Sequence, residues 1–420
     1  MIITILNGNP GESALDARLA EVRSALAGRG ARVTQIDLRT QPIRDCTGCW
    51  DCWVKTPGEC SHDEASQAMG RAVMNCDFLL WAAPLKMGYP AALLKTAMDK
   101  HLPLIHPYIE VDQGEAHHRR RYTRYPRLGL LVEPEADTDD RDLRIVTQLF
   151  SRTALNFKTR LEFCRTTQAP GAEIADWMLD PHSRRLRLPG RLSPTLGTAI
   201  HPPARLTLFN GSPRGPSANS AIFLSEFAQG FGRQTRMVHL VQAQLTPQHL
   251  QAFAEAECAC LGFPLYTDAM PGMVKRFIEA LEPVKGRKNN PPLGFIVQSG
   301  FPEALHSRYI ERYLEKLAGR LGCPYLGTIV KGGGEGVRHG SASENRPLFE
   351  GLHALGEGLA REGRLDAKIL ARLALPERYP AYLGPVFQLF LRLPMAHAPF
   401  DDRLKKNGAY ERRFARPFVD

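Results

Sequence analysis

The chain has 420 residues, 43% of them hydrophobic and 23% charged, which suits a globular protein with two domains, each with its own core. No apolar stretch reaches the roughly 20 residues that cross a bilayer, and no basic leader precedes the first strand pattern, so we expect a cytoplasmic protein without a membrane span. The formal net charge of +10 is spread over helix faces, which indicates a solvated surface or attraction for anionic nucleotides rather than nucleic-acid binding.

The first part of the chain alternates strand and helix patterns. Strands are expected at residues 2–6, 32–38, 76–83, 128–132 and 159–164, and helices at residues 14–27, 93–98 and 143–157. On the first helix, one face carries Leu15, Leu19, Val22 and Leu26. This alternation predicts an α/β fold with a doubly wound parallel sheet, whose ligands lie at the carboxyl ends of the strands.

The second part of the chain repeats motifs of the first part at three places. Residues 4–10 resemble residues 207–213, Pro84-Leu85 resembles Pro264-Leu265, and Leu128-Gly129 resembles Leu293-Gly294, at offsets of 203, 180 and 165 positions. The falling offset predicts two insertions in the first copy. One, of 23 residues, lies between the second and third strands, and the other, of 15 residues, lies within residues 101–125.

These patterns predict two tandem doubly wound domains. We assign residues 1–179 to the first domain, 180–203 to a Pro-, Arg- and Gly-rich linker, 204–365 to the second domain and 366–420 to a helical C-terminal arm. The arm holds an apolar stretch, Leu383 to Leu393, that is too short to span a bilayer and lacks a distinct basic face. We therefore expect the arm to pack on its own domain or on the second subunit of a homodimer, rather than on a membrane surface.

Four of the nine cysteines fall within fifteen residues, which favours ligation over a disulfide framework. Their spacing is C-x2-C-x2-C-x7-C, made by Cys46, Cys49, Cys52 and Cys60. Three cysteines at steps of three residues resemble the start of a ferredoxin run and predict a 4Fe-4S cluster. Two alternatives stay open: unligated redox thiols, and a zinc site, although structural zinc sites usually present two separated pairs.

The remaining cysteines and the histidines of the second insertion carry no clear ligand pattern. Cys76, Cys164, Cys258, Cys260 and Cys323 fall on or beside strands and are expected to be small core residues. His101, His106, His117 and His118 lack the helical spacing with an acidic partner that a zinc protease shows, so we expect them at a surface or interface.

The stretch from Leu206 to Ser220 reads as a strand, a tight turn and a helix start. Unpaired N–H groups at such a helix N-terminus attract anions. The loop adds a bidentate donor, Arg214, and polar side chains suited to a phosphate, namely Ser212, Ser217, Asn219 and Ser220. The alternative is an ordinary serine-rich helix cap.

This loop, GSPRxxxSxNS, followed by Phe263-Pro264-Leu265-Tyr266 and Pro271-Gly272, resembles the NADPH-dependent FMN reductase group of the flavodoxin-like superfamily. The cysteine motif is similar to that of iron-sulfur flavoproteins, a branch of the same group. The resemblance implies that the first loop of the second domain holds the FMN phosphate. It places Pro264, Leu265 and Tyr266 against the flavin ring, and Gln298, Ser299 and Gly300 at its polar edge.

The first domain has weaker counterparts of these loops. Asn9 and Ser13 are its phosphate-loop candidates, and Pro84 and Tyr89 its ring-loop candidates, whereas Glu133 stands where the second domain has Gln298. FMN in the second domain is therefore the stronger prediction, with a first-domain site left open.

The resemblance implies an NAD(P)H oxidoreductase that passes electrons from a reduced nicotinamide through FMN, and through the cluster if present, to a small-molecule or protein acceptor. No catalytic side chain is expected, since hydride transfer belongs to the cofactor. Two alternatives are an electron carrier without a nicotinamide site and a non-catalytic interaction protein structured by zinc.

Overall fold

The computed structural model describes residues 1–112, 114–180, 188, 192–241, 247–379, 384–391 and 393–419. The chain divides into two compact units, unit 1 (Met1–Pro189 and Pro380–Asp420) and unit 2 (Gly190–Tyr379). Parts of the expected linker (residues 181–187 and 189–191) and of the apolar stretch (Leu383 and Arg392) lie outside the described residues. Among the described helices, none has the length and apolar character needed to cross a membrane.

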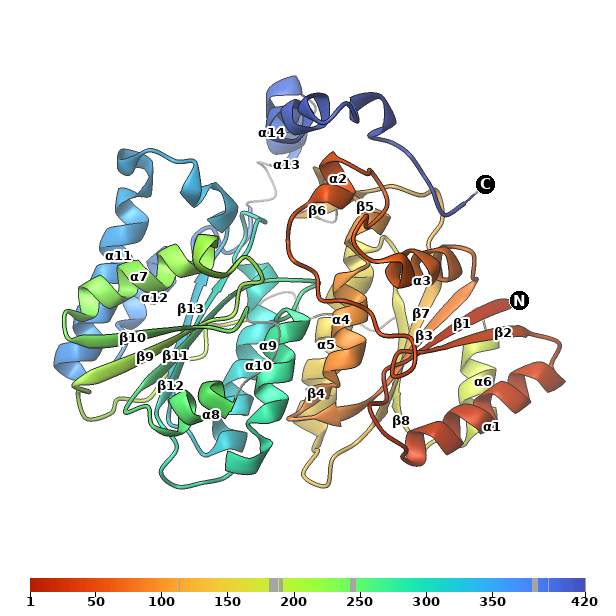
Figure 1. Ribbon diagram of the computed structural model, residues 1–420, viewed down its shortest axis with the longest axis horizontal. Coiled ribbons are helices and arrows are strands. Elements are labelled where there is room, and N and C mark those ends of the chain that lie inside the picture. The colour runs from red at the N-terminus through yellow and green to blue at the C-terminus, as the bar shows by residue number, and fades with distance from the viewer. Residues whose placement is uncertain are drawn as a thin grey trace. The chain divides into compact units, whose positions relative to one another are not determined.

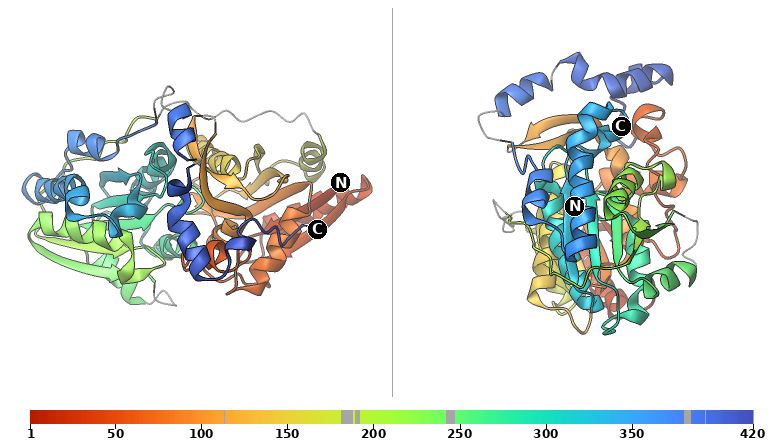
Figure 2. Two further views of the ribbon diagram at one scale, coloured as in Figure 1. Left: turned by 90° about the horizontal axis from the view of Figure 1, so that it is seen from above. Right: turned by 90° about the vertical axis from the view of Figure 1, so that its left-hand side faces the viewer.

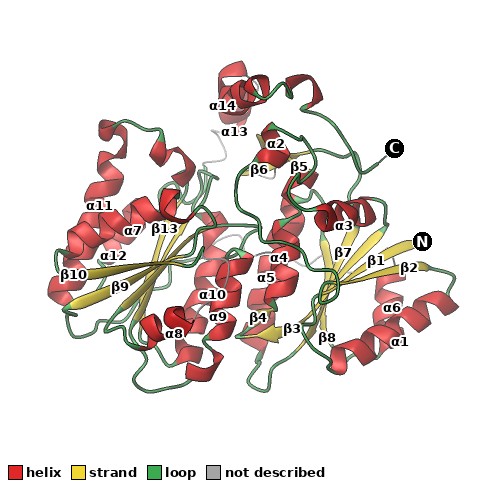
Figure 3. Cartoon of the chain, viewed as in Figure 1, coloured by secondary structure: helices red, strands yellow, loops and turns green. Residues whose placement is uncertain are grey.

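Unit 1 contains one parallel sheet with strand order β2-β1-β3-β7-β8 and helices on both faces (Figures 1 and 3). A short antiparallel strand, β4, pairs with β3. The elements of its first part are β1 (Ile2–Asn7), α1 (Ala14–Gly28), β2 (Arg32–Asp37), α2 (Asp51–Val54), α3 (Glu64–Met74), β3 (Phe78–Lys86), β4 (Tyr89–Pro90), α4 (Ala92–Asp99), η1 (Leu102–Leu104), β5 (Ile105–Asp112), β6 (Glu115–Arg120), β7 (Arg127–Glu133), α5 (Asp140–Asn156), β8 (Leu161–Thr166) and α6 (Gly171–Leu179).

Unit 2 contains a second parallel sheet, with order β10-β9-β11-β12-β13. Its elements are β9 (Arg205–Asn210), η2 (Gly215–Ser217), α7 (Asn219–Phe231), β10 (Gln234–His239), α8 (Pro247–Ala254), β11 (Ala259–Pro264), α9 (Gly272–Ala280), η3 (Glu282–Val284), β12 (Leu293–Gln298), α10 (Leu305–Leu321), β13 (Tyr325–Lys331), η4 (Gly334–Arg338), α11 (Ala342–Glu362) and α12 (Ala367–Leu373). Counted within each unit, both sheets have the order 2-1-3-4-5 of flavodoxin-like folds, which confirms the predicted fold class. Descent of the two units from a duplication stays a prediction.

The core of unit 1 follows the predicted periodicity. The four apolar residues expected on one face of α1 are buried against β1, β3 and α6, as predicted from their spacing: Leu15, Leu19, Val22 and Leu26. Each buried side chain of this size contributes about 1.5–3 kcal/mol of hydrophobic stabilisation. Ser13 caps the helix, and Asp16 completes a capping box with its backbone.

The second insertion folds as an antiparallel hairpin, β5–β6, which the sequence analysis did not predict. The hairpin buries Glu115 in an ion pair with Arg152 of α5, and His117 Nδ1 lies 3.0 Å from Asn156 Oδ1. Of the expectation that the histidines lie at a surface or interface, the surface part was wrong for His101, His106 and His117, which are all buried. Of the five cysteines expected in the core, four are buried and Cys164 is half-buried.

The C-terminal segment (residues 394–419) belongs to unit 1 and lies beside α2 (Figures 1 and 2). It comprises α14 (Pro394–Lys406) and η6 (Tyr410–Arg412), and it follows the short helix α13 (Gly384–Phe390). By contrast α12, within the residues assigned to the arm, packs against α11 and β13 of unit 2. The arm thus contributes to both units, and its last part covers the cysteine-rich loop.

In unit 2, helices α7 and α11 cross at glycines. A Cβ atom added at Gly356 would lie 2.2 Å from the backbone oxygen of Phe227, and one at Gly230 would lie 2.1 Å from the backbone oxygen of His353. These separations are shorter than any side chain tolerates, so the two helix backbones approach each other directly. The crossing anchors α7, whose N-terminus carries the predicted phosphate loop.

We predict that Gly356→Ala lowers the melting temperature of the protein, because the helices must separate, at a cost of roughly 1–3 kcal/mol. Gly319→Ala in α10 is the matched control, since no described atom lies within 4 Å of the added Cβ. There we expect a neutral effect or a gain of about 0.5–1 kcal/mol, from the higher helix propensity of alanine. Differential scanning calorimetry measures both. A Gly356→Ala melting temperature equal to that of Gly319→Ala would contradict the close crossing.

Candidate functional site

Cys46, Cys49, Cys52 and Cys60 line one cavity of unit 1, with a volume of about 550 Å³. All four are free thiols. The opposite wall comes from the end of α4 and the following turn and includes Asp99, Lys100, Leu102 and Pro103. The structure therefore brings the four predicted ligands to one place, with room between them for an inorganic group.

Local backbone geometry explains how four residues of one loop reach the same cavity. Trp50 adopts a left-handed conformation (φ 66°) immediately before the short helix that carries Cys52. After that helix, the Gly58 N–H donates to the Cys52 carbonyl at 2.9 Å, and the Thr56 hydroxyl donates to the Glu59 carbonyl at 2.8 Å. This turn at Thr56-Pro57-Gly58 returns the chain, so that Cys60 lines the same cavity as the other thiols.

The electrostatics of the cavity disfavour free thiolates and favour a bound cation. Burial raises the pKa of Cys46 to about 12. Burial also raises the pKa of Cys52 well above its usual value, and the nearby thiols of Cys46, Cys60 and Cys49 add to the rise. Thiols placed this closely ionise together only when a metal supplies positive charge. The donor types therefore fit an iron-sulfur cluster, whose four thiolates lie farther apart than those of a zinc site.

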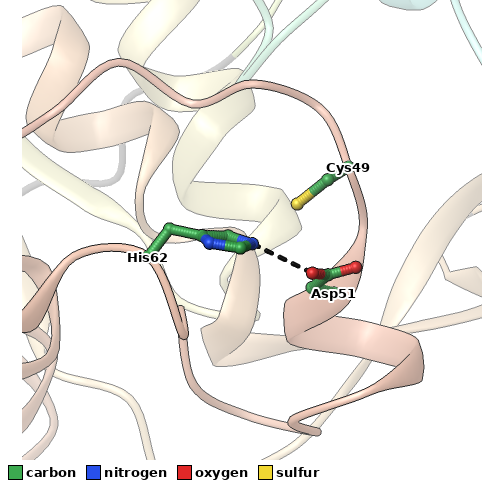
Figure 4. A group of neighbouring side chains, drawn as sticks. All are labelled: Cys49, Asp51 and His62. Atoms are coloured by element: carbon green, nitrogen blue, oxygen red, sulfur yellow. Dashed lines mark hydrogen bonds and ion pairs between the residues drawn. The ribbon is translucent and has the colours of Figure 1, made fainter. Parts of the chain in front are cut away.

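A second donor group overlaps the first at Cys49. Figure 4 shows the side chains of Cys49, Asp51 and His62 directed toward one another, with their ligand atoms within 4.8 Å of each other. His62 Nε2 lies 2.9 Å from Asp51 Oδ2. The sequence analysis did not single out Asp51 or His62, although both flank the cysteines. The mixed sulfur, nitrogen and oxygen set suits zinc better than an iron-sulfur cluster.

The residues proposed to bind FMN in unit 2 lie at the carboxyl ends of three adjacent strands. The phosphate-loop residues follow β9. Pro264 to Tyr266 lie at the end of β11, and Gln298 to Gly300 lie at the end of β12. Backbone hydrogen bonds join these loops. The Gly211 N–H donates to the Gly262 carbonyl at 2.7 Å, and the Leu265 N–H donates to the Gln298 carbonyl at 2.8 Å. This edge is where flavodoxin-like folds bind ligands.

At the N-terminus of α7, the cap residue Ala218 offers no side-chain hydrogen bond to the first turn. Ser220 is 1% exposed, and its hydroxyl has no hydrogen-bond partner among the described residues. The side-chain oxygens of Asn219 and Gln298 are also buried, and neither finds a partner in the described part of the chain. An uncapped helix end beside an unsatisfied hydroxyl fits a phosphate group.

The other polar residues of this loop bond within the protein. The Ser217 hydroxyl donates to the Arg214 carbonyl at 2.8 Å, and Arg214 Nη1 lies 3.0 Å from Glu335 Oε1. Ser212 Oγ accepts from the Arg214 N–H at 3.4 Å. Ser217 is exposed, so within this set the buried Ser220 is the better placed phosphate donor.

In unit 1 the corresponding positions are filled by the protein's own carboxylates. Glu133 accepts hydrogen bonds from the Ser13 hydroxyl and, at 3.3 Å, from the Leu15 N–H at the start of α1. Asp16 accepts from Asn9 Nδ2 at 2.8 Å. The donors predicted to hold a phosphate are thus already bound to anions, which would repel one. These bonds disfavour a phosphate at Asn9 and Ser13, and an FMN site in the first domain stays an open prediction.

The loop of unit 1 that was predicted to contact the flavin ring is also bound by a carboxylate of the protein. The two carboxylate oxygens of Glu135 accept from the N–H groups of Met87 (2.7 Å) and Gly88 (2.8 Å). Tyr89 is buried next to Phe150, and the Pro84 carbonyl accepts from the Ala91 N–H at 3.0 Å. Contact of Pro84 and Tyr89 with a flavin ring stays a prediction.

Solved structures similar to the chain include azoreductases and a quinone reductase. An azoreductase from Bacillus anthracis str. Sterne is 13% identical, covering 37% of this chain and 99% of that one, with a TM-score of 0.31. The FMN-dependent NADH-azoreductase of Bacillus anthracis str. Ames Ancestor in complex with FMN is 14% identical, with coverages of 37% and 100% and a TM-score of 0.31. A putative quinone reductase from Klebsiella pneumoniae is 12% identical, with coverages of 38% and 86% and a TM-score of 0.31.

Sequence comparison is more specific, and it concerns unit 1. An iron-sulfur flavoprotein from Archaeoglobus fulgidus is 32% identical over 92 residues, which are 22% of this chain and span 39% of that protein's length. Residues 1–115 match the model of the NADPH-dependent FMN reductase family. This match confirms, for residues 1–115, the predicted resemblance to the NADPH-dependent FMN reductase group of flavodoxin-like proteins.

Proposed function

We propose that the protein is a flavin-dependent NAD(P)H oxidoreductase that carries FMN in unit 2 and a 4Fe-4S cluster on the four cysteines of unit 1. Electrons pass from a reduced nicotinamide to a small-molecule or protein acceptor. The observation that carries the proposal is the convergence of four thiols on one cavity, in a segment that matches an FMN reductase family. Assembly as a homodimer stays a prediction.

The FMN assignment rests on the contrast between the units. In unit 2 the N-terminus of α7 and the Ser220 hydroxyl receive the phosphate, Arg214 adds positive charge, and Tyr266 and Gln298 lie on the neighbouring loops of the same sheet edge. In unit 1 the same places hold Glu133 and Glu135. Bound FMN supplies hydride acceptance and release of single electrons, while the loops orient the ring.

The cluster assignment gives the cysteine insertion a role. Hydride donors deliver two electrons together, whereas an iron-sulfur cluster takes one at a time, so a cluster adapts the flavin to a one-electron acceptor. Trp50 lines the cavity. The indole N–H of Trp53 donates to the carbonyls of Leu102 and Ile105, both at 3.1 Å, and so ties the cysteine loop to the turn after α4.

A zinc-structured, non-catalytic interaction protein is the second candidate function. The group of Cys49, Asp51 and His62 favours it, because its mixed donors are typical of zinc. Metal analysis of protein purified without oxygen separates the two candidates. Iron with sulfide supports the oxidoreductase, and zinc without flavin supports the interaction protein.

Anaerobic mixing with NADH or NADPH tests the nicotinamide step. We expect the visible absorbance of bound flavin to bleach with at least one of the two. Flavin that bleaches only with a chemical reductant would identify an electron carrier without a nicotinamide site.

A further inference from the structure

Arg121, in the connection between β6 and β7, is a buried cation without an acidic partner in the described part of the chain. Its side chain is 1% exposed, and it forms no ion pair with any described carboxylate. Its Nη2 atom is buried without a hydrogen-bond partner among the described residues. Since arginine stays protonated in proteins, such a charge is costly unless an anion lies nearby.

The cysteine cavity is next to this guanidinium. Arg121 Nε donates to the carbonyl of Pro103 at 2.9 Å, and Pro103 lines the cavity. Burial lowers the pKa of Arg121, while the groups whose negative charge would favour its protonated form are the Cys52 thiol and three phenols: Tyr122, Tyr125 and Tyr108. Phenols are neutral near pH 7. A ligated Cys52 thiolate therefore supplies the anion that Arg121 otherwise lacks.

A second buried cation lies on the same wall. Lys100 Nζ is 3.5 Å from Cys60 Sγ and 3.5 Å from Asp63 Oδ2. Lys100 therefore has a carboxylate partner whether or not the thiols are ligated. Arg121 has no such partner in the described part of the chain, so the energetic cost of burying its charge depends on the state of the cysteines.

The C-terminal segment holds Arg121 in place. Arg121 Nη1 donates to the carbonyls of Arg413 (3.1 Å) and Ala415 (2.9 Å), and Arg416 Nε donates back to the Arg121 carbonyl at 2.9 Å. The same segment packs on the cysteine loop, where a Cβ at Gly58 would lie 2.6 Å from Pro417 Cδ. Residues almost 300 positions apart thus form one shell around the cavity.

Aromatic contacts extend this shell over the loop that carries Cys49 and Cys52. The Phe400 ring lies 5.6 Å from that of Trp50 and 6.0 Å from that of Trp53. The Arg403 guanidinium lies over Trp50 at 5.2 Å, and Asn407 donates to the Val54 carbonyl at 2.9 Å.

We propose that Arg121, clamped by the C-terminal segment, is the positioning residue whose charge balances the anionic centre on the four cysteines and raises its reduction potential. This inference rests on the proposed function. A cluster with four thiolate ligands carries net negative charge, which grows on reduction, so a fixed cation stabilises the reduced state.

The test compares Arg121→Met, which removes the charge and keeps most of the volume, with Arg121→Lys, which keeps the charge. After anaerobic loading with iron and sulfide, a redox titration followed by electron paramagnetic resonance gives the midpoint potential. We expect a more negative potential in Arg121→Met and a near-native one in Arg121→Lys. Arg124→Met is the matched control, because that side chain is 67% exposed and pairs with Asp77. Equal potentials in Arg121→Met and Arg124→Met would overturn the proposal.

If Arg121→Met takes up little iron and sulfide, melting temperatures measured with and without metal still test the proposal. A charge-balancing role predicts that Arg121→Met gains less melting temperature than wild type on metal loading, beyond any loss that the metal-free variant shows from its missing hydrogen bonds to Pro103, Arg413 and Ala415. Equal destabilisation of the free and loaded forms would identify a merely structural residue and overturn the inference. Wild-type protein that takes up zinc but no iron refutes the cluster, and the same melting comparison with zinc still decides the role of Arg121. Protein that binds neither metal contradicts both proposals.

Discussion

Cys52→Ala is expected to abolish iron binding while leaving the flavin content unchanged. Burial raises the pKa of Cys52, and the other three thiols add to the rise; Cys52 also lies outside the group of Cys49, Asp51 and His62. A cluster that loses one thiolate loses a corner and is not retained. We expect iron below one tenth of the wild-type content, measured with sulfide and FMN on the same anaerobic samples.

Two further variants make this result specific. Cys164→Ala removes a thiol on β8, away from the cavity, and is expected to keep full iron content. His62→Ala removes a member of the mixed donor group and is also expected to keep iron. Metal that survives in Cys52→Ala but disappears in His62→Ala would place the ion at Cys49, Asp51 and His62, and would contradict a four-cysteine cluster.

Asn219→Asp is expected to empty the flavin site of unit 2. Asn219 begins α7, and the repeat aligns it with Asp16 of unit 1, whose carboxylate accepts from the donors of the corresponding loop. A carboxylate about 4 Å from the FMN phosphate near a protein surface repels it by on the order of 4 kcal/mol, which lowers the affinity for FMN roughly a thousandfold. Fluorescence titration with FMN measures the loss.

Gln229→Glu is the matched control, because it adds the same charge at an exposed position near the other end of α7. Asn219 also donates to the carbonyls of Gly334 and Glu335, at 3.1 and 3.2 Å, so the melting temperature of flavin-free protein is compared in parallel. Unchanged FMN affinity in Asn219→Asp, together with flavin loss in Ser13→Ala, would move the flavin to unit 1.

The fold was predictable where the chain obeys a regular period. Alternating apolar runs predicted both sheets, and the spacing of Leu15 to Leu26 predicted the buried face of α1. Such predictions succeed because the buried face of a strand or helix repeats with the period of that element. The β5–β6 hairpin was missed, since it lies in an insertion to which nothing in the repeat corresponds. The histidines were misjudged because they pack against residues distant in sequence: His101 against Trp81, His106 against Phe414 and His117 against Asn156.

The site was predictable only in its local parts. The cysteine spacing and the turn at Gly58 are contiguous in sequence, so the convergence of the four thiols could be expected. Glu133 stood out as a replacement for Gln298, but the hydrogen bonds of Glu135 to Met87 and Gly88 depend on two loops meeting. Arg121 gave no signal, because its partners at Arg413 and Ala415 come from the far end of the chain.

The most direct test of the central claim is the composition of the protein purified without oxygen, measured as FMN, iron and acid-labile sulfide per chain. We expect one FMN, held by the proposed phosphate loop of unit 2, together with about four irons and four sulfides held by the four cysteines. Iron-free protein that still reduces its acceptor with NAD(P)H at full rate would contradict the role of the cluster. Two FMN per chain would contradict the closed flavin loops of unit 1.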